Sequence, residues 1–115
     1  IDGNSNIELV IDKVEGSTFN YLFKNNLIKF NDSNESYKDI GTYNFEDTNY
    51  YMDNILNGDS EFKSPSTNEL IIGENSEANL KANIQGTSLV PNDILGTLRS
   101  SPADIGAYQH IIFEN

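Results

Sequence analysis

The apolar residues of this chain come in short runs, and this feature limits the folds that it can adopt. The runs are rich in β-branched and aromatic residues, as β-strands are. No segment keeps a 3.6-residue hydrophobic period over three turns, so we expect little helix. The predicted strands cover residues 7–14, 20–30 (two strands), 50–56 and 69–72. With hydrophobic residues at only 37% of the chain, the core must be assembled from many such pieces.

Polar segments separate these runs and divide the chain. Residues 31–61 carry eight carboxylates and one cation, Lys38, a clustering typical of solvated loops. We expect long loops at about 31–48 and 73–92. The sequence therefore predicts an organisation of short β coils in 1–72, with an acidic loop at about 31–48, followed by a distinct C-terminal segment in 73–115.

A six-residue pattern occurs twice, 28 residues apart. Residues 23–28 read Phe-Lys-Asn-Asn-Leu-Ile and residues 51–56 read Tyr-Met-Asp-Asn-Ile-Leu. This spacing suits stacked repeat units. In a β-helix, each coil turns a sharp corner that needs a left-handed residue, which Asn tolerates well, and Asn amides of successive coils can bond to each other. We expect Asn25, Asn26 and Asn54 to form such corners; the alternative is an ordinary hairpin loop or the edge of an antiparallel β-sandwich.

The last third of the chain contains a specific ending. It reads Asp93-x-x-Gly96-x-x-Arg99, a short gap, and then Asp104 to Tyr108 as Asp-Ile-Gly-Ala-Tyr. This resembles the closing segment of many bacterial secreted or surface-anchored right-handed parallel β-helix proteins, with Gln109 in place of the usual acid. The resemblance covers about 57–109 and implies the last coils and C-terminal cap of such a helix. It also implies an extracellular or cell-surface location.

The resemblance suggests a structural role for the ending, because the open end of a β-helix exposes apolar residues and unpaired edges. We expect Asp93 and Arg99 to close a loop through a charge-assisted hydrogen bond, with Gly96 providing the bend. We expect Ile105, Ala107 and Tyr108 to lie over the open core. The residues assigned to this structural cap are Asp93, Gly96, Arg99, Asp104, Gly106 and Tyr108.

Charge and composition exclude several functions. The net charge is −11, from 18 acidic residues against seven cations, so binding to nucleic acid or to anionic membranes is disfavoured. There is no cysteine, which removes disulfides and thiol chemistry. No apolar run approaches the length of a membrane-spanning helix. The expected partner is instead further β-helix, packed against residues 1–14 from the same chain or another one.

Candidate chemistry in the chain is sparse. His110 is the only histidine and has no recognisable nucleophile motif beside it, so we expect no catalytic residues in this piece; a longer parent protein could still be an enzyme. We expect no cofactor. The best candidate for calcium is the cluster 31–35, in which Asp32 and Glu35 supply carboxylates.

The leading hypothesis is a non-catalytic structural end-piece of a secreted or surface β-helix protein. Two alternatives remain open: part of a polysaccharide-active lyase or glycosidase, and a module that binds carbohydrate or protein. For carbohydrate, Tyr43, Tyr50 and Tyr51 are candidates, because an aromatic ring suits the apolar face of a sugar.

Overall fold

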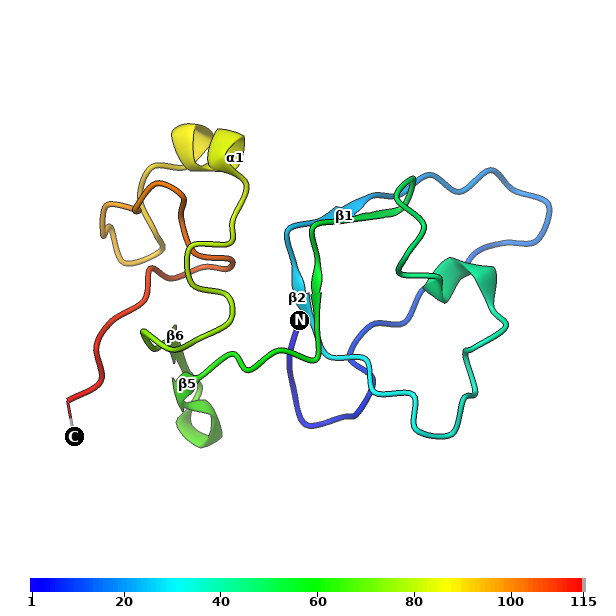
Figure 1. Cartoon of the computed structure of the whole chain (residues 1–115), viewed down its shortest axis with the longest axis horizontal. Helices are drawn as coiled ribbons and strands as arrows, with labels where there is room; N and C mark the ends of the chain where they lie inside the picture. The colour runs from blue at the N-terminus through cyan, green and yellow to red at the C-terminus, as the bar shows by residue number, and fades with distance from the viewer. Residues whose placement is uncertain (115) are drawn as a thin grey trace.

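The computed structural model describes residues 1–114, so Asn115, the last residue of the predicted C-terminal segment, lies outside it (Figure 1). The molecule is flat and elongated, with extents of 48 × 31 × 20 Å. Its regular elements are short strands with little helix, as the sequence predicts. In chain order they are β1 (Phe23–Lys24), β2 (Leu27–Ile28), η1 (Gly41–Tyr43), β3 (Tyr51–Met52), β4 (Ile55–Leu56), β5 (Phe62–Ser64), η2 (Pro65–Thr67), β6 (Glu69–Ile72) and α1 (Ile84–Leu89).

The two copies of the repeated pattern lie side by side as parallel strands. β1 pairs with β3 and β2 pairs with β4, with Phe23 opposite Tyr51 and Leu27 opposite Ile55. Figure 1 shows the chain running along β1, turning a corner into β2, and following the same path again through β3 and β4. Each of these two passes, β1–β2 and β3–β4, is one coil. Parallel pairing excludes a hairpin between these two segments, because hairpin strands are antiparallel.

Two apolar clusters lie on opposite faces of β2. Ile28 is fully buried in the first cluster, which also contains Leu9, Phe30 and Tyr51. Leu27, the preceding residue, belongs to the second cluster together with Ile72 and Ala78. Consecutive strand residues point to opposite faces, so the first cluster fills the inside of the coil and the second covers its outer side.

The predicted strand at 7–14 does not form. Only Ile7 makes a bridge, with Phe30, and this bridge is antiparallel. The alternation read from the sequence is present all the same: Leu9 is buried, Ile7 and Ile11 pack against the first cluster, and Val10 is 73% exposed. The side chains thus follow a strand pattern although the backbone has no regular ladder of partners.

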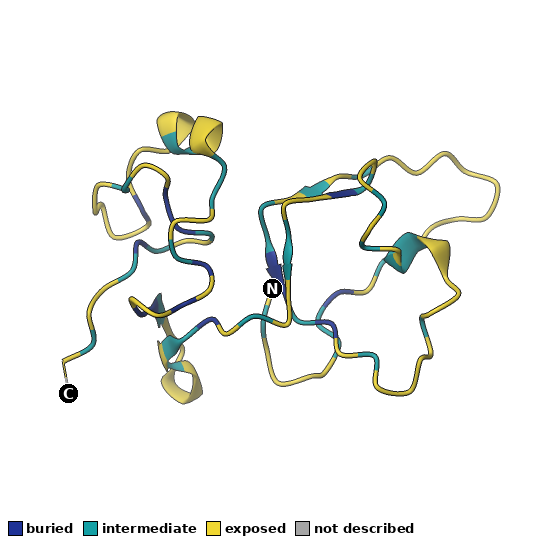
Figure 2. Cartoon of the chain, viewed as in Figure 1, coloured by how far each residue is buried: buried dark blue, intermediate teal, exposed yellow. Residues whose placement is uncertain are grey.

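The second half of the chain folds beside the coil (Figures 1 and 2). β5 and β6 form an antiparallel pair with a register shift between Phe62 and Ser64. α1 lies in the segment that we predicted to be a loop at 73–92, so that prediction was wrong at this point. The helix begins because the Asn83 side chain accepts hydrogen bonds from the backbone N–H groups of Gln85 and Gly86. Six residues are too few to produce a recognisable hydrophobic period.

Candidate functional site

The corner of each coil contains a residue in the left-handed region. Asn25 has φ 54° between β1 and β2, and Asp53 has φ 55° between β3 and β4. The two residues are 28 apart, like the strands around them. We had assigned Asn25 to this corner but not Asp53, although Asp is the other residue that tolerates this conformation well.

The next position in each coil forms an amide contact between coils. The side-chain oxygen of Asn54 accepts hydrogen bonds from the backbone N–H of Asn26 at 2.9 Å and from its side-chain amide at 3.0 Å. The Asn54 amide in turn donates to the carbonyl oxygen of Phe23 at 2.8 Å. The structure therefore brings Asn26 and Asn54 together as a two-step ladder, next to the strained corner rather than within it.

Asp93 organises the first loop of the closing segment. Its Oδ1 accepts hydrogen bonds from the N–H groups of Leu95 at 2.9 Å and Thr97 at 2.8 Å. Its Oδ2 accepts from the N–H of Gln109 at 2.9 Å, which ties the loop to the end of the chain. Gly96 has φ +83°, so the bend in this loop uses the left-handed region. These contacts lower the pKa of the Asp93 carboxyl below its ordinary value, chiefly through the Gln109 N–H.

Arg99 has a different partner from the one we expected. Its guanidinium donates to the carbonyl oxygens of Gly106 at 3.0 Å and Ala107 at 3.4 Å, and the structure contains no ion pair between Arg99 and Asp93 among residues 1–114. The predicted closure through that pair was therefore wrong. Backbone N–H groups already occupy both oxygens of Asp93, and Arg99 instead holds the Gly106–Ala107 segment through its carbonyl oxygens.

Asp104 is the most deeply placed charged side chain described, at 1% exposure. One oxygen accepts a hydrogen bond from the N–H of Leu80 at 2.8 Å. The other faces both the N–H and the Nδ1 of His110, the latter at 2.8 Å. Asp104 thus joins the loop before α1 to the end of the chain.

The acid–imidazole pair invites comparison with a catalytic dyad. The nearest hydroxyl of the same network, Ser100 Oγ, donates to the carbonyl oxygen of Pro102 and accepts from the Gln109 amide, both at 2.8 Å. Its proton is directed at a carbonyl and not at His110, so this arrangement lacks the nucleophile–base bond of a triad. In this geometry the network connects three chain segments.

The closing segment lies on the flank of the coil and not over its open end. Ile105 packs against the second cluster, next to Leu27, whereas the inside of the coil is filled by the first cluster. The expectation that Ile105, Ala107 and Tyr108 cover the open core was therefore wrong. Ala107 and Tyr108 instead line an apolar cavity of about 210 Å³ between the coil and β5–β6.

Gly106 also differs from its expected role. A side chain there would meet nothing within 4 Å, so no close backbone approach requires glycine. Its φ of +114° does, because this region is costly for residues with a Cβ atom.

The candidate calcium residues are engaged in local contacts. The Asp32 carboxylate accepts from the N–H groups of Ser36 at 2.9 Å and Tyr37 at 2.8 Å, and Glu35 pairs with Lys38 at 3.0 Å. Across residues 1–114, the structure gathers no three His, Asp or Glu side chains in a metal-binding arrangement. Calcium binding stays a prediction that these contacts do not favour.

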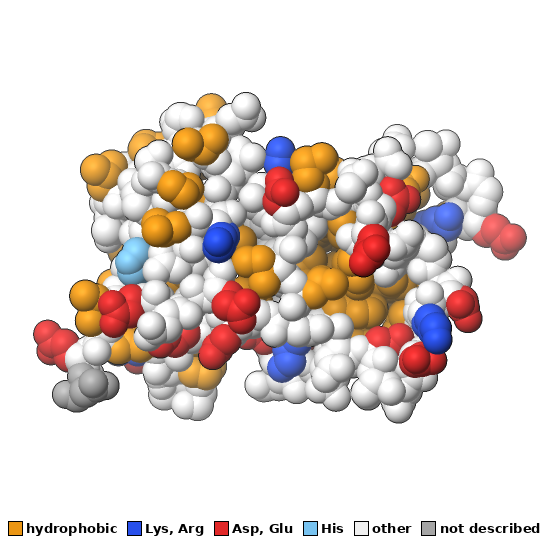
Figure 3. All heavy atoms as spheres, viewed as in Figure 1, with side chains coloured by type: hydrophobic (Ala, Val, Ile, Leu, Met, Phe, Trp, Pro, Cys, Tyr) orange, Lys and Arg blue, Asp and Glu red, His pale blue; other side chains and the backbone are white. Residues whose placement is uncertain are grey.

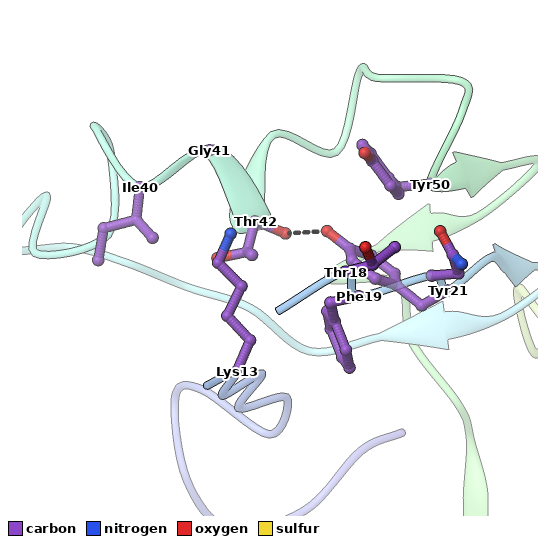
Figure 4. A pocket seen from close by; sticks show the side chains of 9 residues that line it. Lys13, Thr18, Phe19, Tyr21, Ile40, Gly41, Thr42 and Tyr50 are labelled. Atoms are coloured by element: carbon purple, nitrogen blue, oxygen red, sulfur yellow. Dashed lines mark hydrogen bonds between the residues drawn. The ribbon is translucent and has the colours of Figure 1, made fainter. Parts of the chain in front are cut away.

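A pocket open to solvent lies between residues 13–21 and the acidic loop at 31–48 (Figure 4). The pocket has a volume of about 530 Å³. It is lined by Lys13, Thr18, Phe19, Asn20, Tyr21, Ile40, Gly41, Thr42 and Tyr50. Of the tyrosines proposed from the sequence, Tyr50 lines it, Tyr51 is only 3% exposed in the core, and the Tyr43 hydroxyl bonds to the backbone of Ile11. Sequence reasoning missed Phe19 and Tyr21, although the alternating Phe19, Tyr21 and Phe23 could have indicated a shared aromatic face.

Acidic side chains are scattered over the face in Figure 3, between patches of exposed hydrophobic side chains. No helix within residues 1–114 is both long and apolar enough to cross a membrane.

No family model, no curated protein and no solved structure matches the chain.

Proposed function

We propose that this chain is a structural end-piece of a secreted or cell-surface protein with a right-handed parallel β-helix. In this proposal the two coils formed by β1–β2 and β3–β4 stack on further coils, and the segment after residue 57 ends the helix by leaving the stacking direction. The observation that carries the proposal is the parallel, in-register pairing of two copies of one sequence pattern 28 residues apart.

The corner chemistry supports this reading. A coil of a parallel β-helix must turn without a hairpin, and the left-handed residues Asn25 and Asp53 turn the chain at equivalent positions. The Asn26–Asn54 contact links the two coils beside these corners, between residues 28 apart, which is also the spacing of the paired strands. The strand pairs, the two corner residues and the amide contact all relate positions 28 residues apart, as a stacked architecture requires.

The exposed surface supports a neighbour for the coil. The accessible surface is 7877 Å² for a chain of 12.9 kDa, whereas a compact monomer of this size exposes about 6,300 Å². β1 and β3 form a sheet of only two strands, so each has one edge without a strand partner among residues 1–114. An unpaired edge is a template for another strand, and a further coil would satisfy it.

The closing segment contributes by bracing the flank of the coil. Ile105 packs against the cluster of Leu27, Ile72 and Ala78, and the Asn25 side chain donates to the Lys81 carbonyl at 3.1 Å. The role that we propose for the ending is therefore lateral support of the last coil, in place of the cover over its cross-section that the sequence suggested.

Duplicating one coil tests the proposal. A second copy of residues 20–47, inserted directly after residue 47, adds one 28-residue unit between β2 and β3. If the coil is a repeating unit, the insert stacks in register and raises the denaturation midpoint, since each added repeat contributes an interface. Circular dichroism measures the β structure that a stacked insert adds, and urea denaturation measures the midpoint.

A matched insertion controls for chain length. The same 28 residues in shuffled order should lower the midpoint, because a long loop without strands only adds closure entropy. Equal destabilisation by the ordered and the shuffled insert would overturn the proposal, since it would mean that the coil has no capacity to stack.

A further inference from the structure

The pocket in Figure 4 combines an aromatic wall with polar groups at its rim. Phe19, Tyr21 and Tyr50 form the wall: the ring centroids of Phe19 and Tyr21 are 5.1 Å apart, and those of Tyr21 and Tyr50 are 4.7 Å apart and stacked. Phe19 is 39% exposed, so this wall is accessible to solvent. An accessible aromatic wall in a hollow of about 530 Å³ has the size of a small-ligand site.

The central ring of the wall is held in place by the core. The Tyr21 hydroxyl donates to the Thr42 carbonyl at 3.1 Å, as the dashed line in Figure 4 shows. The buried Tyr51 hydroxyl donates to the same carbonyl and its ring packs edge-on against Tyr21. The hydrogen bond of Tyr21 to Thr42 and the packing of the Tyr51 ring hold Tyr21 in place before a ligand binds. A side chain that is already fixed loses little conformational entropy on binding.

The polar groups of the pocket are mostly uncharged. Thr18, Asn20 and Thr42 line it and can offer hydroxyl and amide groups, and Figure 4 shows Lys13 reaching toward Thr42. No carboxylate lines the pocket. Lys13 therefore supplies the only formal charge of the lining, in the form of three hydrogen-bond donors.

We propose that this pocket binds an uncharged pyranose unit of a saccharide. The apolar face of the sugar ring would lie on Phe19 and Tyr21, with Tyr50 beside them. Its hydroxyls would exchange hydrogen bonds with Lys13, Asn20 and Thr42. An anionic sugar is disfavoured because the single cation faces a molecule of net charge −11. This site is independent of the structural role proposed above: the coil could stack whether or not the pocket is occupied.

A titration with defined sugars tests the proposal. Methyl glucoside, methyl galactoside and their neutral tetrasaccharides are added to the whole chain, and binding is followed by NMR shifts and by tyrosine fluorescence, since the chain has six tyrosines and no tryptophan. We expect a dissociation constant of about 0.1–10 mM for at least one neutral sugar, in the range of a shallow site with few contacts. Glucuronate at the same concentration should bind at least fivefold more weakly.

Variants assign the binding to this pocket. F19A should weaken the neutral sugar at least fivefold by removing the exposed ring. K13Q should weaken it about threefold, because it replaces the three-donor ammonium by a shorter, uncharged amide. Leu22, 53% exposed and outside the pocket, gives the matched control L22A, which should bind as the parent chain does. F19A truncates a half-exposed ring, and circular dichroism verifies that its fold is retained.

Three outcomes would overturn the site: no response to any neutral sugar, preference for glucuronate, or unchanged affinity in both F19A and K13Q. None of these outcomes bears on the coil-duplication experiment, so the two proposals fail separately.

Discussion

The side-chain amide of Asn26 lies 3.0 Å from the side-chain oxygen of Asn54, a residue 28 positions later in the chain. The contact sits between two parallel strand pairs with the same spacing, Phe23 with Tyr51 and Leu27 with Ile55. A side-chain ladder with the period of the backbone register fixes which residues of the two passes stand opposite each other.

Asn54→Ala should destabilise the fold by about 2–3 kcal/mol, since it leaves the Asn26 N–H and the Phe23 carbonyl without partners in a half-buried position. Urea denaturation measures the change. Asn34 is exposed in the acidic loop, and Asn34→Ala should stay within about 0.5 kcal/mol of the parent chain. Equal effects of the two substitutions would show that the ladder contributes nothing to stability.

Two glycines with open space around them should respond in opposite directions to alanine. Gly96 has φ +83°, so Gly96→Ala should cost about 1–2 kcal/mol. Gly86 lies inside α1, so Gly86→Ala should gain about 0.5–1 kcal/mol from helix propensity. Thermal unfolding of both variants checks the sign of each change. A Gly96→Ala variant as stable as the parent would contradict the left-handed bend.

The stability of the fold should depend on the ionisation of Asp93. The pKa of its carboxyl lies below its ordinary value in the folded chain, chiefly because the Gln109 N–H bonds to the carboxylate. As the pH falls, the unfolded chain takes up this proton first, so the stabilisation is present above about pH 4 and is lost progressively below it. Asp93→Asn should therefore lower stability at pH 7 and flatten its decline between about pH 5 and pH 2.

A charge-matched variant completes the pH experiment. Asp12 is exposed, and Asp12→Asn removes the same charge without touching the closing segment. Its stability should follow the pH curve of the parent chain in urea titrations. If Asp12→Asn and Asp93→Asn flatten the curve equally, the effect comes from net charge and not from the contacts of Asp93.

Asp104→Asn should be among the most destabilising single substitutions, at about 2–4 kcal/mol. The carboxylate is 1% exposed and accepts hydrogen bonds from Leu80 and from two groups of His110. The groups around this carboxylate donate hydrogen bonds, whereas the amide of Asn replaces one of its two acceptor oxygens by an NH2 donor. That NH2 would face a buried N–H that loses its acceptor. Asp39→Asn, at an exposed site, is the matched control. Hydrogen exchange should localise the loss of protection to the 78–82 and 104–110 segments.

The two strands in 20–30 could be predicted from the sequence, since periodicity, apolar content and corner residues agree there. β6 falls on its predicted residues 69–72 for the same reason. The strand predicted over 50–56 is divided into β3 and β4 by the left-handed Asp53. The strand at 7–14 could not be excluded, because alternation reports which side chains are buried and not whether the backbone has a partner. Leu9 is buried as the alternation requires, yet only Ile7 pairs, through a single bridge.

Some features of the candidate sites could also be predicted from the sequence, and others could not. Positive φ at Asn25 and Gly96 follows from residue type, because few other residues tolerate it. The hydrogen-bond partners of Asp93 and Arg99 could not be predicted from the sequence. Their spacing along the chain does not show whether the carboxylate accepts from a guanidinium or from backbone N–H groups. The pocket around Tyr21 joins residues 13, 18–21, 40–42 and 50, a combination that only the folded path of the acidic loop creates.

The position of Ile105 has a consequence for the register of the two passes. Leu27 and Ile55 stand opposite each other, and Ile55 and Ile105 both pack against the surface of the cluster that contains Leu27. A slip of β4 by one residue would turn Leu56 to that surface and carry Ile55 inward. The closing segment meets its apolar contacts only when the two passes are in this register. Its docking therefore adds stability to the aligned register that a slipped one would lack.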